Sequence, residues 1–341
     1  MVLVMAEKNV TALHPPIRSS VKYSAHLLDD FLAWIQGRFQ QADLSIFHQF
    51  APPPSGGGHQ FLRALWNETE SFGLKVENNT ISRTTRACLF NSFNFDERRL
   101  QRLRRDSVLY VHRVDGPIDV YRGRDEGIDQ HICQINHKFA DKTIFQSYYS
   151  LEKHLALGLQ FKDPEIVLNA VDSAIFNTQG RVQFSHNRKT RLVAASWSDN
   201  PRKGAPVYTW LDEHLDWEHF EFTFIGRSPV QFKNIRMIDP VPSNQLANYF
   251  REHDIYITAS QNDPCSNSLL EALSCGAPAL YLKSGGHPEI VKEAGLGFDS
   301  AEEIPALLEK LVTDYEKYQA RIEVPTMTSI AGKYLKILGL M

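Results

Sequence analysis

The chain of 341 residues lacks the features that would place it in a specialised class of protein. Its four cysteines show neither a Cys-x-x-Cys spacing nor a zinc pattern with the histidines, so we expect reduced thiols in a cytoplasmic protein. No apolar run reaches membrane-spanning length, and the apolar start is too short for a secretory signal. A formal charge of −3 gives no general reason to expect a nucleic-acid partner.

Short apolar runs alternate with helical patterns along most of the chain. The runs that predict buried strands are 44–48, 73–76, 87–90, 108–111, 142–147 and 165–172, then 191–195, 222–226, 234–238, 255–259 and 277–282. Ser243 and the pair Ser300 and Glu303 predict helix starts. Because this alternation occurs on both sides of a polar stretch at 179–191, we predict two doubly wound, Rossmann-like α/β domains joined by that linker.

The predicted domains are residues 1–180 and 190–325, followed by a final helix within 326–341. Residues 1–43 form an extension, in which apolar side chains between positions 27 and 35 predict an amphipathic helix. That helix either packs on the domain or lies on a membrane surface. The basic stretch 98–105 also has two interpretations, as a solvated helix face or as a contact for anionic lipid or phosphate.

The segment 255–276 carries the clearest candidate site. Its first five residues predict a buried strand, a polar loop follows, and leucines at helical spacing then lead to Gly276 at a helix end. Open α/β sheets bind ligands at the carboxyl ends of their strands, and the free amides of a helix start attract phosphate. Glu271, one turn after Asn267, would repel a phosphate but can accept hydrogen bonds from sugar hydroxyls. The segment therefore predicts a sugar-phosphate site.

Three other stretches place polar or flexible residues near the same edge of a sheet. Glycines at 56–58 precede a predicted helix, where they form either a ligand-binding loop or a plain turn. Arg202 and Lys203 follow the strand 191–195, either as exposed charges or as phosphate contacts. His112 follows the strand 108–111, which predicts either a cleft residue or a structural histidine with satisfied hydrogen bonds.

From about residue 44 onward the chain resembles the retaining glycosyltransferases of family 4, also called glycosyl transferases group 1. The landmarks are Asp263 and Glu271 for the Glu-x7-Glu pair, 201–204 for the Lys-Gly loop, 224–226 and 285–289 for two glycine turns, and Gly57, Gly58, Val111 and His112 in the first domain. The resemblance implies a GT-B architecture, with two Rossmann-like domains facing an interdomain cleft. It also implies that the final helix crosses back to the first domain.

The resemblance further implies a nucleotide-diphosphate sugar held mainly by the second domain and an acceptor held mainly by the first. Glu271 would bind the ribose, Asp263 the donor sugar, Lys203 the diphosphate, and His112 would approach the sugar from the opposite wall. The other donor-binding candidates are Arg202, Gly57, Gly58, Gly226, Cys265, Ser266, Asn267 and Ser268. The implied reaction is front-face substitution with retention. No Asp-x-Asp occurs, so we expect neither a metal nor another cofactor.

Two residues depart from the family pattern. Asp263 is one methylene shorter than the usual glutamate, and Ser198 stands where an arginine is usual, with Arg202 as its candidate replacement. These departures keep open a non-catalytic, sugar-nucleotide-binding subunit, and a nucleotide-sugar epimerase of the same fold is a further alternative. The expected acceptor is a glycan, a lipid-linked molecule or a small molecule, and the expected location is cytoplasmic, with a possible peripheral contact at the inner membrane surface.

Overall fold

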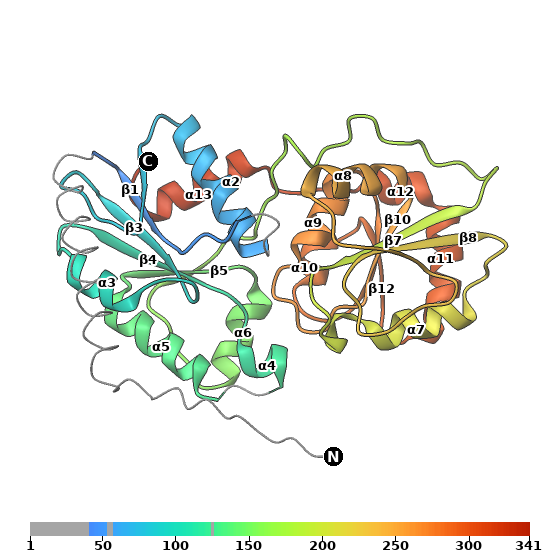
Figure 1. Ribbon diagram of the computed structural model, residues 1–341, viewed down its shortest axis with the longest axis horizontal. Helices are drawn as coiled ribbons and strands as arrows, with labels where there is room; N and C mark the ends of the chain where they lie inside the picture. Colours follow the sequence, from blue (N-terminus) through green and yellow to red (C-terminus); the bar gives the residue numbers. More distant parts are fainter. Residues whose placement is uncertain (1–40, 53–56, 124–125) are drawn as a thin grey trace, which may run out of the picture.

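The structure, a computed structural model, describes residues 41–52, 57–123 and 126–341. The amphipathic helix expected before residue 41 and Gly56 lie outside the described residues. Two six-stranded parallel sheets, each with helices on both faces, form two domains that lie side by side (Figure 1). The predicted pair of doubly wound Rossmann-like domains is confirmed. Among the described residues, no helix has the length and apolar character to span a membrane.

The first domain is built on a sheet with the order β2-β1-β3-β4-β5-β6. Its strands are β1 (Leu44–Phe47), β2 (Val76–Asn78), β3 (Ala87–Asn91), β4 (Leu109–Val114), β5 (Lys142–Phe145) and β6 (Pro164–Ile166). Its helices are α2 (Gly57–Ser71), α3 (Glu97–Leu103), α4 (Ile118–Arg122), α5 (Ile128–Phe139) and α6 (Tyr148–Ala156). The central strands are buried on both faces, which explains why they appear in the sequence as continuous apolar runs.

The second domain repeats this plan with the strand order β12-β11-β10-β7-β8-β9. Its strands are β7 (Thr190–Ser196), β8 (Phe220–Gly226), β9 (Arg236–Ile238), β10 (Ile255–Thr258), β11 (Ala279–Leu282) and β12 (Gly295–Phe298). Its helices are η1 (Pro201–Lys203), α7 (Ala205–His214), α8 (Ser243–Glu252), α9 (Asn267–Ser274), α10 (His287–Val291), η2 (Ala301–Glu303), α11 (Ile304–Thr313) and α12 (Tyr315–Gln319). Helices α9 and α10 face the first domain (Figure 1).

The last helix, α13 (Met327–Ile337), packs on the first domain rather than on the second, which precedes it in the chain. Its residues Ile330, Tyr334 and Leu335 are buried in the same core as Leu44 of β1. The rings of Tyr334 and Phe61 on α2 lie 5.7 Å apart between centroids. The chain therefore connects the domains twice, before β7 and before α13 (Figure 1).

Several local predictions were wrong. The second strand lies at Val76–Asn78 instead of 73–76, and helices α5 and α7 were not predicted. Ser243 does not cap α8, because Pro242 holds the cap position and the Ser243 hydroxyl pairs with Gln60 of the first domain. Ser300 makes no capping hydrogen bond to η2 or α11. Helix α5 has a buried face that includes Asp129 and Asn136, and such polar residues weaken the apolar periodicity.

The basic stretch at 98–105 holds the first domain together through several of its arginines. Arg99 donates to the carbonyl of Asn79 at 2.7 Å, and Arg104 donates to the carbonyl of Lys138 at 2.7 Å. Arg105 donates to the carbonyl of Thr85 at 3.2 Å. These contacts favour a structural role for the three side chains over a contact for lipid.

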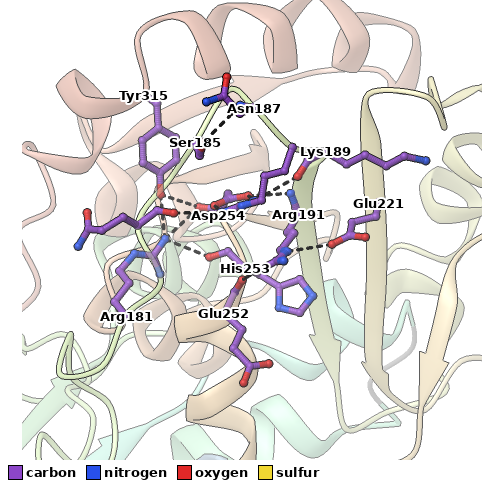
Figure 2. A network of polar contacts seen from close by, with 12 residues as sticks. Arg181, Ser185, Asn187, Lys189, Arg191, Glu221, Glu252, His253, Asp254 and Tyr315 are labelled. Carbon is purple, nitrogen blue, oxygen red and sulfur yellow. Dashed lines mark hydrogen bonds and ion pairs between the residues drawn. The ribbon is translucent and has the colours of Figure 1, made fainter.

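The linker is tied to the second domain at the edge of the sheet where its parallel strands begin (Figure 2). Asp254, which precedes β10, forms a two-pronged ion pair with Arg188, with distances of 2.6 and 2.8 Å. Arg181 donates to the carbonyls of Phe250, Cys275, His253 and Asp254 and to the Tyr315 hydroxyl. A guanidinium with several acceptors loses little mobility per bond. Arg181 and Arg188 therefore anchor the stretch 181–189 to the second domain.

Candidate functional site

A cavity of about 400 Å³ lies between the two domains at the carboxyl ends of their strands. It brings together most of the candidates from the sequence, namely Gly57, Gly58, Lys203, Asp263, Cys265, Ser266, Asn267, Ser268 and Glu271, and it also contains Ser198. Parallel α/β sheets bind ligands at this edge. Three candidates, His112, Arg202 and Gly226, do not line it.

Lys203 and Asp263 form the charged centre of the cavity. Lys203 ends η1 after β7, Asp263 lies in the loop after β10, and Lys203 Nζ is 2.7 Å from Asp263 Oδ2. Burial opposes charge on both groups, but each stabilises the charge of the other, so the pKa of Lys203 is raised and the pKa of Asp263 is lowered. The Lys203 ammonium also lies 5.2 Å from the ring centroid of Tyr121 in the first domain.

Glycines hold the Asp263 loop in place. The Gly286 amide donates to the Asp263 carbonyl at 2.9 Å, and a Cβ on Gly285 or Gly286 would collide with the backbone of Asp263 or Pro264. Gly285 also has a φ of +67°, which side-chain-bearing residues rarely adopt. The glycine turn at 285–289 therefore supports the loop that presents Asp263.

Helix α9 begins at the floor of the cavity. Ser266 is its N-cap and accepts from the Leu269 amide at 3.4 Å, while Asp263 Oδ1 accepts from the Cys265 amide at 3.3 Å. Burial raises the pKa of the Cys265 thiol to about 12, so this cysteine is a packing residue rather than a nucleophile. The first turn of α9 leaves amide dipoles directed at the cavity, which favours an anion there.

Gly57 provides the close approach of the first domain to α9. A Cβ on Gly57 would collide with the side-chain amide of Asn267, whereas a Cβ on Gly58 would meet nothing within 4 Å. Asn267 is held from the first domain as well, because Asn169 Nδ2 donates to its Oδ1 at 2.9 Å. The two glycines therefore have different roles, although they are neighbours at the start of α2.

Glu271 lies at the junction of this cavity with a second one of about 370 Å³. The second cavity is largely apolar and lies between α2 and residues of the second domain, with Phe61, Ala64, Ile175, Phe176 and Pro242 among its walls. Glu271 is 7% exposed, and burial raises its pKa to about 8. A neutral carboxyl group can both donate and accept hydrogen bonds, which suits a ligand that carries hydroxyl groups.

The prediction that His112 lies in a loop at the cleft is wrong. Strand β4 continues to Val114, so His112 lies within the sheet, where it is completely buried and stacked on Phe90 at 4.5 Å between ring centroids. Asn136 Nδ2 lies 3.2 Å from its Nδ1, and Ser92 Oγ lies 3.2 Å from its Nε2. Burial lowers its pKa to about 3. These contacts favour the structural alternative for this histidine.

Arg113 and Asp115 occupy the strand end instead, and both line the cavity. Arg113 is 1% exposed and donates to Asn91 at 3.1 Å, to Asp115 Oδ1 at 3.0 Å and to Asn169 at 2.8 Å. Gln146 also donates to Asp115 Oδ1. Neither residue was predicted as part of the site, because the apolar run ends at Val111 and the strand continues three residues further. The Gly-Pro that follows Asp115 is the signal that would have marked the strand end.

Arg202 and Gly226 act near the site without entering it. The guanidinium of Arg202 donates to the carbonyls of Val120 and Tyr121 in the first domain, at 2.9 and 3.3 Å. Gly226 ends β8 with a φ of +121°, and a Cβ there would collide with the carbonyl of Ser196. Gly226 thus permits close packing of the strand end that leads to η1.

Comparison with known structures identifies the architecture. Sucrose-phosphate synthase from Thermosynechococcus elongatus aligns with a TM-score of 0.68 and 14% identity over 87% of this chain and 98% of that one. The catalytic domain of starch synthase IV from Arabidopsis thaliana, bound to ADP and acarbose, gives 0.66 and 13% over 88% and 99%. The fold is GT-B. Another GT-B structure, Anabaena HepE in complex with UDP-glucose, gives 0.63 and 14% over 89% and 100%.

Sequence comparison points to the second GT-B domain. The family model Glycosyl transferases group 1 matches residues 232–324, which include Asp263, Glu271 and the glycine turn at 285–289. D-inositol 3-phosphate glycosyltransferase from Corynebacterium glutamicum (strain R) is 26% identical over 137 residues. That alignment spans 40% of this chain and 28% of the length of the relative.

Proposed function

We propose that this protein is a retaining glycosyltransferase of family 4 that transfers a sugar from a nucleotide-diphosphate sugar to an acceptor. The observation that carries the proposal is the pair of adjoining cavities with Glu271 at their junction. The apolar cavity suits a nucleoside, and the polar cavity suits a diphosphate and a sugar. The family match over residues 232–324 supports the same assignment.

The second domain supplies the charge that the reaction needs. Breaking the bond between the sugar and the diphosphate leaves negative charge on the phosphate, which Lys203 and the amides at the start of α9 are placed to stabilise. Lys203 then leaves Asp263 and pairs with the diphosphate. Asp263 becomes available to accept hydrogen bonds from hydroxyls of the donor sugar.

The proposed reaction is a front-face substitution without a metal ion. The acceptor oxygen bonds to the anomeric carbon as the bond from that carbon to the phosphate oxygen breaks. The electron pair goes to the diphosphate, which also takes the proton of the acceptor hydroxyl. Fixed cations and helix dipoles can supply the stabilisation that a metal provides in other enzymes.

The first domain supplies the acceptor wall in this proposal. Its cavity residues include Phe93, Arg113, Asp115, Gln146 and Asn169, a set rich in hydrogen-bonding groups. Such a wall suits a hydroxyl-bearing acceptor, whether a glycan, a lipid-linked sugar or a small molecule. A cytoplasmic location, with peripheral contact at the inner membrane surface for a lipid-linked acceptor, completes the proposal.

Calorimetric titration of the purified protein with UDP, GDP and ADP tests the donor site. We expect micromolar binding of one of them, and release of that nucleotide from its glucose conjugate, at least slowly with water as acceptor. Absence of binding by all three nucleotides would contradict the proposal. A product with inverted anomeric configuration, detected by proton NMR, would contradict retention alone.

A non-catalytic, sugar-nucleotide-binding subunit is the second candidate. The observation in its favour is that Ser198 stands in the cavity where the family has an arginine, while Arg202 is directed at the first domain. Binding of a nucleotide sugar by the pure protein, with no release of nucleotide until a partner protein is added, would support this candidate over the enzyme.

A further inference from the structure

Side chains of the second domain form hydrogen bonds with two helix ends of the first domain, beside the cavity. Tyr121 of α4 exposes its carbonyl to Arg202 Nη1 at 3.3 Å, and the Val120 carbonyl accepts from Arg202 at 2.9 Å and from Asn262 Nδ2 at 3.1 Å. The last carbonyls of a helix have no partner within the helix and carry partial negative charge. A guanidinium and an amide N–H are therefore favourable partners for this end of α4.

The contact at α6 has the opposite polarity. Glu289 of α10 accepts from the amides of Tyr148 and Tyr149, the first two residues of α6, at 2.9 and 2.8 Å. The first amides of a helix lack partners within it and carry partial positive charge, so a carboxylate is the favourable partner. The Tyr149 hydroxyl also donates to Asn262 Oδ1 at 2.7 Å. We call the contacts of Arg202, Asn262 and Glu289 with the first domain the clasp.

Two of the three clasp residues are adjacent in sequence to the charged residues of the cavity. Arg202 precedes Lys203 on η1, and Asn262 precedes Asp263 in the loop after β10. The Val120 carbonyl therefore accepts from a side chain of each of the two segments that carry the Lys203 and Asp263 ion pair. Moving the first domain away would release both segments at once.

Resting on the proposed function, we propose that Arg202, Asn262 and Glu289 are positioning residues that hold the domains closed and place Lys203 and Asp263 for sugar transfer. In this role Arg202 binds no phosphate itself. This positioning role differs from the donor-binding role that the family resemblance implies for Arg202. The two roles predict different effects of replacing Arg202.

Amide hydrogen exchange measures the clasp without any ligand. The Tyr148 and Tyr149 amides are protected through Glu289, so Glu289→Gln should speed their exchange at least tenfold. Arg202 contacts neither amide, but Arg202→Ala should also speed exchange of the Tyr148 and Tyr149 amides, because the substitution loosens closure of the domains. Unchanged exchange in Arg202→Ala would overturn the inference. The matched controls are Arg236→Ala, an exposed arginine of the second domain, and Glu293→Gln, which pairs with Arg321 within that domain.

Nucleotide binding and turnover separate the clasp from a phosphate contact. For Arg202→Ala we expect the affinity for UDP, or for GDP or ADP if wild-type protein binds those, to stay within about threefold. Release of nucleotide from the matching glucose conjugate at saturation should fall about tenfold or more. A parallel loss of affinity and turnover would identify Arg202 as a phosphate ligand and overturn the inference. Failure of wild-type protein to bind any of the three would instead reject the proposed function, while the exchange experiment would still decide whether the clasp holds the domains closed.

Discussion

Lys203 and Asp263 neutralise each other across 2.7 Å in the centre of the cleft. They follow different strands, β7 and β10, which are neighbours in the same sheet. Before any ligand binds, the charge that would stabilise a diphosphate is therefore already matched by a carboxylate. A bound diphosphate must compete with Asp263 for the Lys203 ammonium group, so the ion pair weakens binding of the diphosphate. Contacts that form only in the transition state can offset this loss.

Replacement of Lys203 by alanine should reduce turnover more than affinity. We expect a loss of about 100-fold in the rate of donor cleavage at saturation, because the leaving phosphate loses its cation, with a smaller change in the Kd for the nucleotide. Stability should fall as well, since Asp263 remains buried without its partner. The double variant Lys203→Ala/Asp263→Asn should regain stability, measured by urea denaturation, but not turnover. Equal losses in rate and affinity for the single variant would indicate simple docking.

Glu271→Gln should flatten the pH dependence of stability. The pKa of Glu271 is raised from 4.5 to about 8 by burial, so between these values the folded protein holds a proton that the unfolded chain has released. This group therefore stabilises the fold fully below pH 4.5, and its contribution is lost as the pH rises to 8. The free energy of unfolding of wild-type protein should decrease over this window relative to Glu271→Gln. Parallel curves for the two proteins would show that the carboxyl group titrates normally.

Glu271→Ala should weaken nucleotide binding about tenfold or more, because hydroxyls in the junction of the two cavities lose a hydrogen-bond partner. Calorimetry with the preferred nucleoside diphosphate checks the effect. The same titration with inorganic pyrophosphate is the control, since a ligand without a ribose should bind both proteins alike. Unchanged affinity for the nucleotide would contradict the assignment.

His112→Ala should destabilise the first domain without a specific effect on the reaction. Both ring nitrogens have partners and the ring is stacked on Phe90, so we expect a loss of about 2–4 kcal/mol in the free energy of unfolding. The lowered pKa means that this residue stabilises the fold above pH 6.5 and loses that effect as the pH falls toward 3. Turnover per folded molecule should stay within a few-fold of wild type, and a loss of 1,000-fold would restore His112 to the active site.

Gly57→Ala and Gly58→Ala form a matched pair. Both residues open α2, but only a Cβ on Gly57 meets Asn267 across the cleft. We expect Gly57→Ala to weaken nucleotide binding about tenfold by pushing the domains apart, and Gly58→Ala to bind like wild type. Small-angle X-ray scattering should show a larger radius of gyration for the first variant alone. Equal behaviour of the two would mean that the Asn267 side chain moves aside without cost.

Treatment with EDTA should leave donor cleavage unchanged, because the proposed mechanism relies on Lys203 and the α9 amides. Restoration of lost activity by Mg²⁺ or Mn²⁺ would reject the metal-free mechanism.

The parts of the site that the local sequence pattern alone predicts lie within one short segment, whereas Lys203, Gly57 and Gly58 were assigned to the site through the family resemblance. The strand, loop and helix of 255–276 contain Asp263, Asn267 and Glu271, and the local pattern placed all three at the cavity. Arg113 and Asp115 were missed because their importance depends on where β4 ends, and an apolar run does not show that boundary. Arg202 is the clearest case of a role that depends on tertiary structure, since its acceptors lie about 80 residues earlier in the chain.

The fold was predictable for a similar reason. Buried parallel strands appear in the sequence as apolar runs, so most strands and both Rossmann-like domains could be recognised. Short edge strands such as β2, and helices whose buried face carries polar residues such as α5, give weak signals and were misplaced or missed. Contacts between the domains leave no periodic pattern, so the clasp required the structure.

The return of α13 to the first domain has a consequence for the order in which the two domains become stable during synthesis. Residues 44–180 leave the ribosome first, yet Ile330, Tyr334 and Leu335 complete the core that covers Leu44 and Phe61. During synthesis, the second domain can close its own core while the first still exposes an apolar groove along α2. The domain that is translated first should therefore be the last to become stable, and premature stops before Met327 should yield aggregation-prone chains.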